Sequence, residues 1–481
     1  MEKDYCPILD ASIPNPDAMT ISRRRFVRSA AAISLSFSGL RCANADSVFS
    51  SGPGVGFGPL ADDPEGLLAL PEGFRYTVIS RRGERMTDGF LVPGSHDGMA
   101  AFPGPGGQTL LVRNHEVNYG ADPAQGAFGV RNELLGRLDP SLLYDAGRGA
   151  GPMLGGTTTL LFNTQAQRLE SHHLSLAGTL RNCAGGPTPW GSWITCEETL
   201  ARAGGALARD HGYPFEVRAS LDGLPDRAVA LTGMGRFNHE AVAVDPASSV
   251  VYQTEDNVEG LLYRFVPNVP GALHEGGVLQ ALALRDQPSF DTRNFGRPQV
   301  EPGESFDVEW IGLSDTDSPG GDLNQRGFAS GAARFACGEG IWYGNEEVYF
   351  ACTNGGRAQK GQIWRYRPSL FEGTAQESGE PGSLELFVEP NDGTLVENAD
   401  NITAAPWGDL VVCEDGTGDD YLVGITPAGE IYKLAHNLNG DGELAGSCFS
   451  PDGTTLFVNM QSDGLTLAIT GDWSEGRHRT A

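Results

Sequence analysis

The feature that most constrains this chain is an internal repeat. Ten residues from Pro189 to Glu198 (PWGSWITCEE) align without gaps on those from Pro406 to Asp415 (PWGDLVVCED). Such a pair indicates an architecture that uses one supersecondary unit many times. The two copies lie 217 residues apart, and blades of about 40–50 residues would place four or five units in that interval.

The sequence between these copies favours short β-strands. Brief apolar runs are bounded by Gly, Pro, Asp or Asn, which is typical of strands joined by turns. The clearest runs are 109–113, 157–163, 241–244, 250–254, 348–353, 409–413 and 455–460. A helical period is visible only over residues 132–143. We therefore predict an all-β fold, a β-propeller of about six blades with loop or short helical insertions.

The first 45 residues predict an export signal. Arg23, Arg24 and Arg25 precede a short apolar run and then the small residues Ala43-Asn44-Ala45. Paired arginines before Phe26 and Val27 indicate a twin-arginine signal, with an ordinary secretory signal as the alternative. We expect residues 1–45 to be this signal peptide and residues 46–481 to form a single propeller domain. The chain would then engage the twin-arginine export machinery and reach the periplasm or the extracellular space.

Charge and cysteine content limit the partners. The net charge is −28, which argues against nucleic acid or an anionic membrane as a partner. Such acidity is compatible with carboxylates that bind hard cations, and also with simple solubility. No stretch beyond the signal is apolar enough for an integral membrane segment, and we expect a monomer. The remaining cysteines lack CxxC spacing, so we expect few disulfides.

The repeat also predicts where a metal ion could bind. It places Cys183 and Asp400 at equivalent positions before a strand, and Glu198 and Asp415 at equivalent positions where that strand ends. Equivalent positions of successive blades converge on the propeller axis, so these side chains would meet in the channel. A thiolate among carboxylates suits a transition metal beside a harder cation such as Ca²⁺. The alternative is that these acids are solvated turn residues.

Several motifs then carry a family resemblance. The chain resembles the PhoX-type alkaline phosphatases in five segments that occur in order from about Pro71 to Trp473. These segments are 182–198 (NCAGGPTPWG…TCEE), 235–241 (GRFNHEA), 352–364 (CTNGG…GQIW), 400–402 (DNI) and 446–453 (GSCFSPDG).

The resemblance implies both an activity and a set of ligands. It implies a propeller that holds iron and calcium with a bridging oxo group, and that hydrolyses small phosphomonoesters. Cys183 would be the thiolate ligand of iron. The carboxylate ligands would be Glu198, Glu240, Glu339 and Asp400, with Glu116 and Glu414 as further candidates. Glu339 would also belong to the catalytic site.

One departure from the family pattern affects the predicted substrate site. The resemblance implies an arginine two residues before Glu339 that contacts the phosphate, and here that residue is Cys337. A thiol does not replace a bidentate guanidinium. Arg334, Arg357 or Lys360 could supply the cation instead. Two alternatives to a phosphatase therefore stay open: a related hydrolase, such as a lactonase or phosphodiesterase, or a propeller that binds cations without catalysis.

Overall fold

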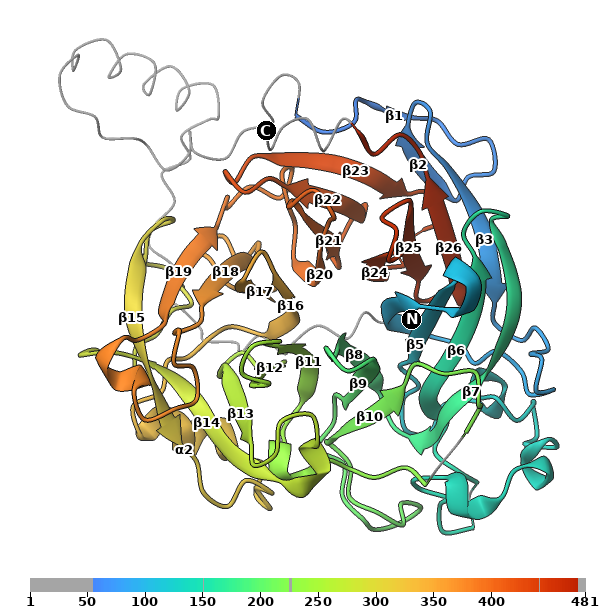
Figure 1. Cartoon of the computed structure of the whole chain (residues 1–481), viewed down its shortest axis with the longest axis horizontal. Helices are drawn as coiled ribbons and strands as arrows, with labels where there is room; N and C mark the ends of the chain where they lie inside the picture. Colours follow the sequence, from blue (N-terminus) through green and yellow to red (C-terminus); the bar gives the residue numbers. More distant parts are fainter. Residues whose placement is uncertain (1–54, 150, 225–226, 441, 475–481) are drawn as a thin grey trace, which may run out of the picture.

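Six blades surround a central channel in the computed structural model (Figure 1). The structure describes residues 55–149, 151–224, 227–440 and 442–474. The first blade contains β4 (His96–Pro103), β5 (Thr109–His115), β6 (Gly155–Asn163) and β7 (Arg168–Thr179). The second contains β8 (Asn182–Pro187), β9 (Ser192–Glu197) and β10 (Pro214–Arg218). The third contains β11 (His239–Val244), β12 (Val251–Glu255), β13 (Tyr263–Pro267) and β14 (Gly277–Leu284).

The other three blades repeat this antiparallel pattern. The fourth contains β16 (Gly338–Gly344), β17 (Glu347–Cys352), β18 (Gln362–Arg367) and β19 (Ser383–Val388). The fifth contains β20 (Ala399–Ala404), β21 (Leu410–Glu414), β22 (Tyr421–Ile425) and β23 (Ile431–Asn437). The sixth contains β24 (Leu444–Phe449), β25 (Thr455–Met460) and β26 (Leu465–Thr470), completed by β3 (Arg75–Arg81).

Two connections join neighbouring parts of the ring. Strand β3 comes early in the chain and pairs with β26, so the last blade is closed by an N-terminal strand. Strand β15 (Ser305–Gly312) pairs with both β14 and β19, which links the third and fourth blades into one sheet. Strands β1 (Leu60–Ala61) and β2 (Leu68–Pro71) extend the edge of the fifth blade through β23.

Apolar side chains pack between the blades. Where the fifth and sixth blades meet, Phe57, Trp407 and Trp473 form an aromatic group with ring centroids 5.5–5.7 Å apart. Cys196, Cys352, Cys413 and Cys448 are buried free thiols, as apolar strand positions lead us to expect. No helix among the described residues is long and apolar enough to cross a membrane.

The predicted strands are confirmed, and the predicted helix is wrong. Each apolar run falls within a strand or within a residue or two of its bounds. The segment 132–143 instead forms two short 3-10 turns, Leu135–Arg137 and Pro140–Leu142. Pro140 lacks the N–H that an α-helix would need at this point. The α-helix of the described residues, α2 (Leu323–Ala329), has seven residues and was not anticipated.

The repeat corresponds to equivalent hairpins of two blades, but the number of blades that its spacing predicts is wrong. Its copies form the β8–β9 and β20–β21 hairpins of the second and fifth blades. Three blade steps therefore separate them, and the expectation of four or five units between them is wrong. A long connection within the interval accounts for the difference, since residues 285–337 separate β14 from β16. The overall prediction of about six blades holds.

Candidate metal centre

Every inner strand begins with the same irregularity. Strands β4, β8, β11, β16, β20 and β24 follow one another around the channel. In each of them the pairing register shifts across three residues near the start of the strand, as at Asn182/Gly185 and Gly338/Ile341. Such a bulge re-aims a side chain. We call the residue that follows the last pair before this shift the bulge position, and it is occupied by Asp97, Cys183, Glu240, Glu339, Asp400 and Gly446.

The backbone before the bulge has the same unusual conformation in most of the blades. The residue two positions earlier adopts a left-handed conformation in four blades. These residues are Ser95 (φ 44°), Arg181 (φ 48°), Cys337 (φ 48°) and Asn398 (φ 52°). The inner strands also approach closely, because a Cβ added to Gly340 would lie 2.7 Å from the Cα of Asn401. The turn and the close approach together fix where the bulge side chain lies.

A second set of acids comes from the neighbouring strand of each hairpin. In the first, second, third and fifth blades, the first paired residue of the inner strand pairs with a residue of the next strand. These partners are His115, Glu197, Glu255 and Glu414. Because side chains alternate along a strand, the residue after each of these points to the opposite side. We call this the strand-end position, and its acidic members are Glu116, Glu198, Asp256 and Asp415.

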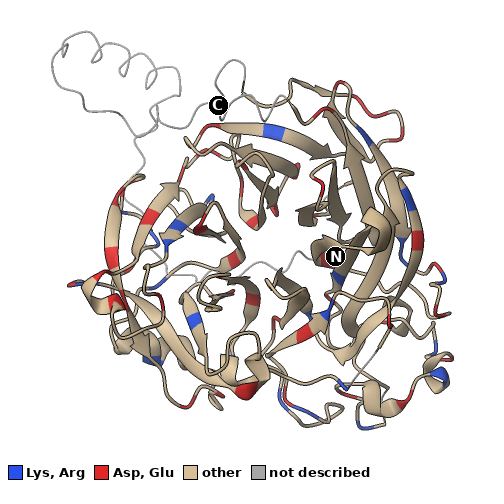
Figure 2. Ribbon diagram, viewed as in Figure 1, with Lys and Arg blue, Asp and Glu red and all other residues tan. Residues whose placement is uncertain are grey.

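These two sets form one group that we name the channel cluster. It contains Asp97, Glu116, Cys183, Glu198, Glu240, Asp256, Glu339, Asp400, Asp415 and the nearby Glu443. Figure 2 shows acidic segments at the inner ends of several blades. Three overlapping groups within it have potential ligand atoms within 4.8 Å of one another. They are Asp97–Glu116–Cys183, Cys183–Glu198–Glu240 and Glu240–Glu339–Asp400.

Polar neighbours orient the side chains of the channel cluster. The Cys183 thiol donates to Glu240 Oε1 at 3.1 Å. Gln461 Nε2 donates to Asp97 Oδ2 at 3.0 Å and to Glu116 Oε2 at 2.9 Å. Asn401 Nδ2 donates to Asp400 Oδ1 at 3.1 Å. These contacts hold the side chains in place before any ligand arrives.

The electrostatics of the channel cluster favour a bound cation. Burial, followed by the charge of Glu198, raises the pKa of Glu240 well above its usual range. Burial and the charge of Asp415 raise the pKa of Asp400 to about 8. Burial together with the neighbouring Asp97 likewise raises the pKa of the Cys183 thiol. So many acids in one buried place require protons or cations to offset their mutual repulsion.

The donor atoms fit metal ions. Among the described residues, Glu240 Oε2 and Asp256 Oδ1 are buried without a hydrogen-bond partner. Carboxylate oxygens are the donors that Ca²⁺ prefers, and one thiolate favours a transition metal such as iron. Among the ion pairs between described residues, those of Arg181 with Glu116 and Glu198 are the ones that bring a cation to the channel cluster. A single guanidinium does not balance this many carboxylates.

A buried histidine anchors the chain behind Glu198. His211 Nδ1 lies 2.7 Å from Glu197 Oε1, and its Nε2 lies 3.2 Å from Asp145 Oδ2. All three side chains are fully buried. Burial disfavours protonation of His211, but the charges of Glu197 and Asp145 outweigh it and raise the pKa of the imidazole. Glu197 is thereby fixed, and with it the end of β9 that presents Glu198 to the channel.

The structure brings together most of the predicted ligands. Cys183, Glu116, Glu198, Glu240, Glu339 and Asp400 all lie in the channel cluster. Glu414 was a candidate and is not part of it, because its carboxylate points into the blade and accepts from Lys433 Nζ at 2.8 Å. Alternation along β21 explains the difference, since Glu414 precedes the strand-end position that Asp415 occupies.

The predicted cations lie elsewhere. The Arg334 guanidinium forms an ion pair with Glu259 at 3.2 Å and lies over the Phe328 ring. Arg357 is exposed, and its backbone N–H donates to Glu389. Lys360 pairs with Glu397. None of these contacts involves the channel cluster, so the expectation that one of these three cations lies there gains no support. Cys337 is fully buried.

Sequence reasoning missed four residues of this site. Asp97, Asp256 and Glu443 belong to the channel cluster, and Arg181 contacts two of its carboxylates. A signal for Asp97 was present, because Asp97-Gly98, Cys183-Ala184, Glu240-Ala241 and Glu339-Gly340 all place a ligand type before a small residue. A signal for Asp256 was present too, because Glu255-Asp256 is a pair of acids like Glu197-Glu198. Glu443 lies in a connection that carries no comparable pattern.

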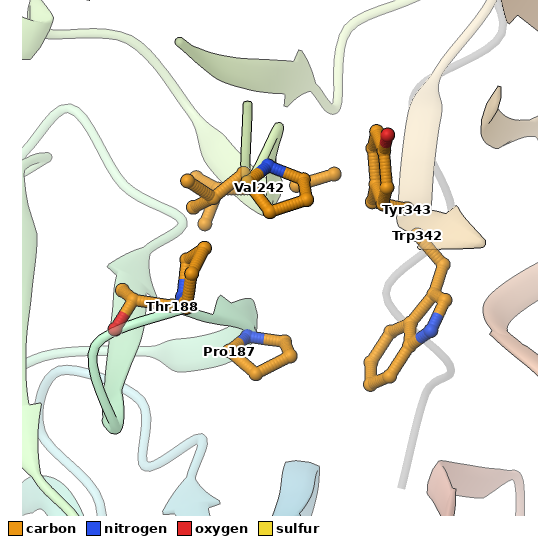
Figure 3. A pocket seen from close by; sticks show the side chains of 9 residues that line it. Pro187, Thr188, Val242, Trp342 and Tyr343 are labelled. Carbon is orange, nitrogen blue, oxygen red and sulfur yellow. The ribbon is translucent and has the colours of Figure 1, made fainter. Parts of the chain in front are cut away.

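An apolar pocket lies at the other end of the same inner strands. Pro187, Thr188, Val242, Trp342 and Tyr343 line it, together with neighbouring residues, around a volume of about 220 Å³ (Figure 3). These residues come from the last residues of β8, β11 and β16 and the turns after them, whereas the channel cluster uses the first residues of those strands. The pocket contains no acidic side chain and is separate from the candidate metal centre.

One solved structure supports this architecture. PhoX from Pseudomonas fluorescens, solved in complex with vanadate, is 18% identical and covers 87% of this chain and 98% of its own, with a TM-score of 0.63. A gluconolactonase from Xanthomonas campestris is 13% identical and covers 86% and 98%, with a TM-score of 0.38. No curated protein matches by sequence.

A family model provides the assignment. The model described as alkaline phosphatase PhoX matches residues 55–135 and 148–464. These ranges include every residue of the channel cluster and both copies of the repeat. This chain belongs to the PhoX alkaline phosphatase family.

Proposed function

We propose that this protein is a metal-dependent phosphomonoesterase that releases phosphate from small organic esters. The observation that carries the proposal is the convergence of five bulge side chains, Asp97, Cys183, Glu240, Glu339 and Asp400, on one end of the channel. Family membership supports a phosphatase activity. The substrate would approach the channel at the end that carries these residues.

The chemistry of each side chain indicates which metal ion it would bind. Cys183 would ligate iron, and Glu198, Glu240, Glu339 and Asp400 would hold calcium or be shared between the two metals. When bound, the ions would lower the pKa of water and neutralise charge that develops on the phosphoryl group. Gln461 and Asn401 would keep the carboxylates in place through the hydrogen bonds described above. Glu116 would complete the centre beside Asp97.

Metal analysis and hydrolysis of an aryl phosphate test this function together. Protein purified after export is expected to contain iron and calcium and to release phosphate from the ester. Treatment with a chelator is expected to abolish hydrolysis, and re-addition of both metals to restore it. Full metal occupancy with no hydrolysis would contradict the phosphatase assignment. It would leave the lactonase, the phosphodiesterase and the non-catalytic propeller, and an ester and lactone panel would separate these.

Export is a separate part of the proposal. Residues 1–45 lie outside the described residues, and we propose that they direct folded protein through the twin-arginine machinery to the periplasm or beyond. Changing Arg23, Arg24 and Arg25 together to Lys is expected to retain precursor in the cytoplasm, because this signal is recognised through its arginines. Fractionation and immunoblotting measure the distribution. Unchanged export of the triple variant would indicate the general secretory route.

A further inference from the structure

Arg181 is placed at the candidate metal centre by the backbone and by two carboxylates. It lies between β7 and β8, two residues before Cys183. Its Nε donates to Glu116 Oε1 at 3.0 Å, and its Nη2 lies 2.5 Å from Glu198 Oε2. Glu116 belongs to the first blade and Glu198 to the second, so the guanidinium bridges two blades beside the channel. Contacts through two of its nitrogens fix the plane of the group.

Arg181 also occupies a backbone position that recurs in another blade. Arg181 and Cys337 occupy the same position in the second and fourth blades, each two residues before a bulge side chain and each with φ of 48°. Cys337 is the residue at which the family resemblance implies an arginine. The chain therefore carries an arginine at this position of the backbone, but in a different blade. The position is suited to a side chain that reaches the channel cluster, as the contacts of Arg181 demonstrate.

The exposure and chemistry of Arg181 fit a role in anion binding. Its side chain is 23% exposed, whereas those of Glu116 and Glu198 are 10% and 8% exposed. The guanidinium thus lies between buried carboxylates and solvent. An anionic ester is repelled by carboxylates and attracted by a guanidinium, whose planar donors match phosphate oxygens. We propose that Arg181 binds the phosphoryl group of the substrate, an inference that rests on the proposed phosphatase function and names its substrate-binding cation.

Phosphate binding tests this role directly. Inorganic phosphate is titrated calorimetrically into metal-loaded protein and into its Arg181→Gln and Arg181→Lys variants. Loss of one charge-assisted contact is expected to weaken phosphate binding by about 10- to 200-fold in Arg181→Gln. Arg181→Lys keeps the positive charge beside Glu116 and Glu198. Its phosphate affinity is expected to lie between those of the unmodified protein and Arg181→Gln, because an ammonium lacks the planar arrangement of donors of a guanidinium. Iron and calcium content is measured in each protein.

A matched control separates this role from a merely structural one. Arg365 on β18 also contacts two carboxylates, Glu385 and Glu347, and its side chain is 15% exposed. Arg365→Gln is expected to keep the phosphate affinity of the unmodified protein. Wild-type phosphate affinity in Arg181→Gln with full metal content would overturn the inference. Equal weakening in the Arg365 variant would overturn it as well.

The outcome for Arg181 can be distinguished from that for the proposed function. Aryl phosphate hydrolysis by the unmodified protein decides whether it is a phosphatase. Phosphate affinity decides whether Arg181 binds the anion, even if no hydrolysis is found. Hydrolysis with unchanged phosphate affinity in Arg181→Gln would keep the phosphatase and reject Arg181.

Discussion

Asp400→Asn is expected to lower the bound metal and to reduce phosphatase activity by more than about 100-fold. An amide oxygen is a weaker ligand than a carboxylate, and loss of even an outer-shell partner costs about 10- to 100-fold in metal affinity or activity. Asp400 shares its group with Glu240 and Glu339, so the ligand set for one ion would be incomplete. Elemental analysis and initial rates with an aryl phosphate measure both effects. Cys183→Ser is expected to reduce iron in particular, because it removes the thiolate.

Glu414→Gln is the matched control for this experiment. It makes the same acid-to-amide change on the neighbouring strand of the fifth blade, but Glu414 faces Lys433 and not the channel. Metal content is therefore expected to stay at the wild-type level. Full metal content in both Asp400→Asn and Cys183→Ser would show that the ligand assignment is wrong. Loss of metal in Glu414→Gln with unchanged folding would restore that residue as a ligand.

Removing His211 is expected to produce the largest loss of stability. His211→Ala leaves Glu197 and Asp145 fully buried without the cation that separates them. Breaking a buried pair in this way costs about 3–5 kcal/mol. The midpoint of thermal unfolding, compared at one protein and metal concentration, is expected to fall by several degrees. Because Glu198 follows Glu197, metal affinity is expected to fall as well.

The pH dependence and two further variants check the cause of this loss. A pKa that is raised in the folded state contributes stability at low pH that is lost as pH rises through it. The difference between wild type and His211→Ala is therefore expected to shrink on the alkaline side of that pKa. His274→Ala, at an exposed histidine 3.4 Å from Glu275, is expected to change stability by less than about 0.5 kcal/mol. Adding Glu197→Gln to His211→Ala should recover part of the loss, and no recovery would contradict the electrostatic explanation.

The fold could be predicted from the sequence wherever local patterns determine it. The run from Thr455 to Met460 coincides with β25, because a short apolar run bounded by turns is typical of a buried strand. The repeat identified two equivalent hairpins, and the pairing of Asn182 with Glu197 and of Ala399 with Glu414 matches their alignment. The number of blades between them could not be predicted, because long connections have no fixed length.

Site residues could be predicted where they stand in a recognisable motif. They could not be predicted where their position depends only on how the strands pair in the fold. Cys183, Glu240 and Asp400 stand in recognisable segments, and all reach the channel cluster. Asp256 and Arg181 lie just outside regular strands, and their positions depend on where a strand ends and a bulge begins. Two Asn-His-Glu triplets, residues 114–116 and 238–240, look alike in the sequence but lie at different places in the fold. Glu116 ends a second strand, while Glu240 follows the start of an inner strand, so the triplets are not equivalent.

The closing of the ring by β3 has a consequence for the order of events during synthesis. Residues 75–81 leave the ribosome early, but their partner, β26, is made near the end of the chain. At about 5–20 residues per second, β3 waits roughly 20 to 80 s for that partner. The channel cluster takes Asp97 from the first blade and Glu443 from the segment leading into the last. A nascent or truncated chain would therefore lack a complete channel cluster, and we expect full metal loading only after the last blade has been synthesised.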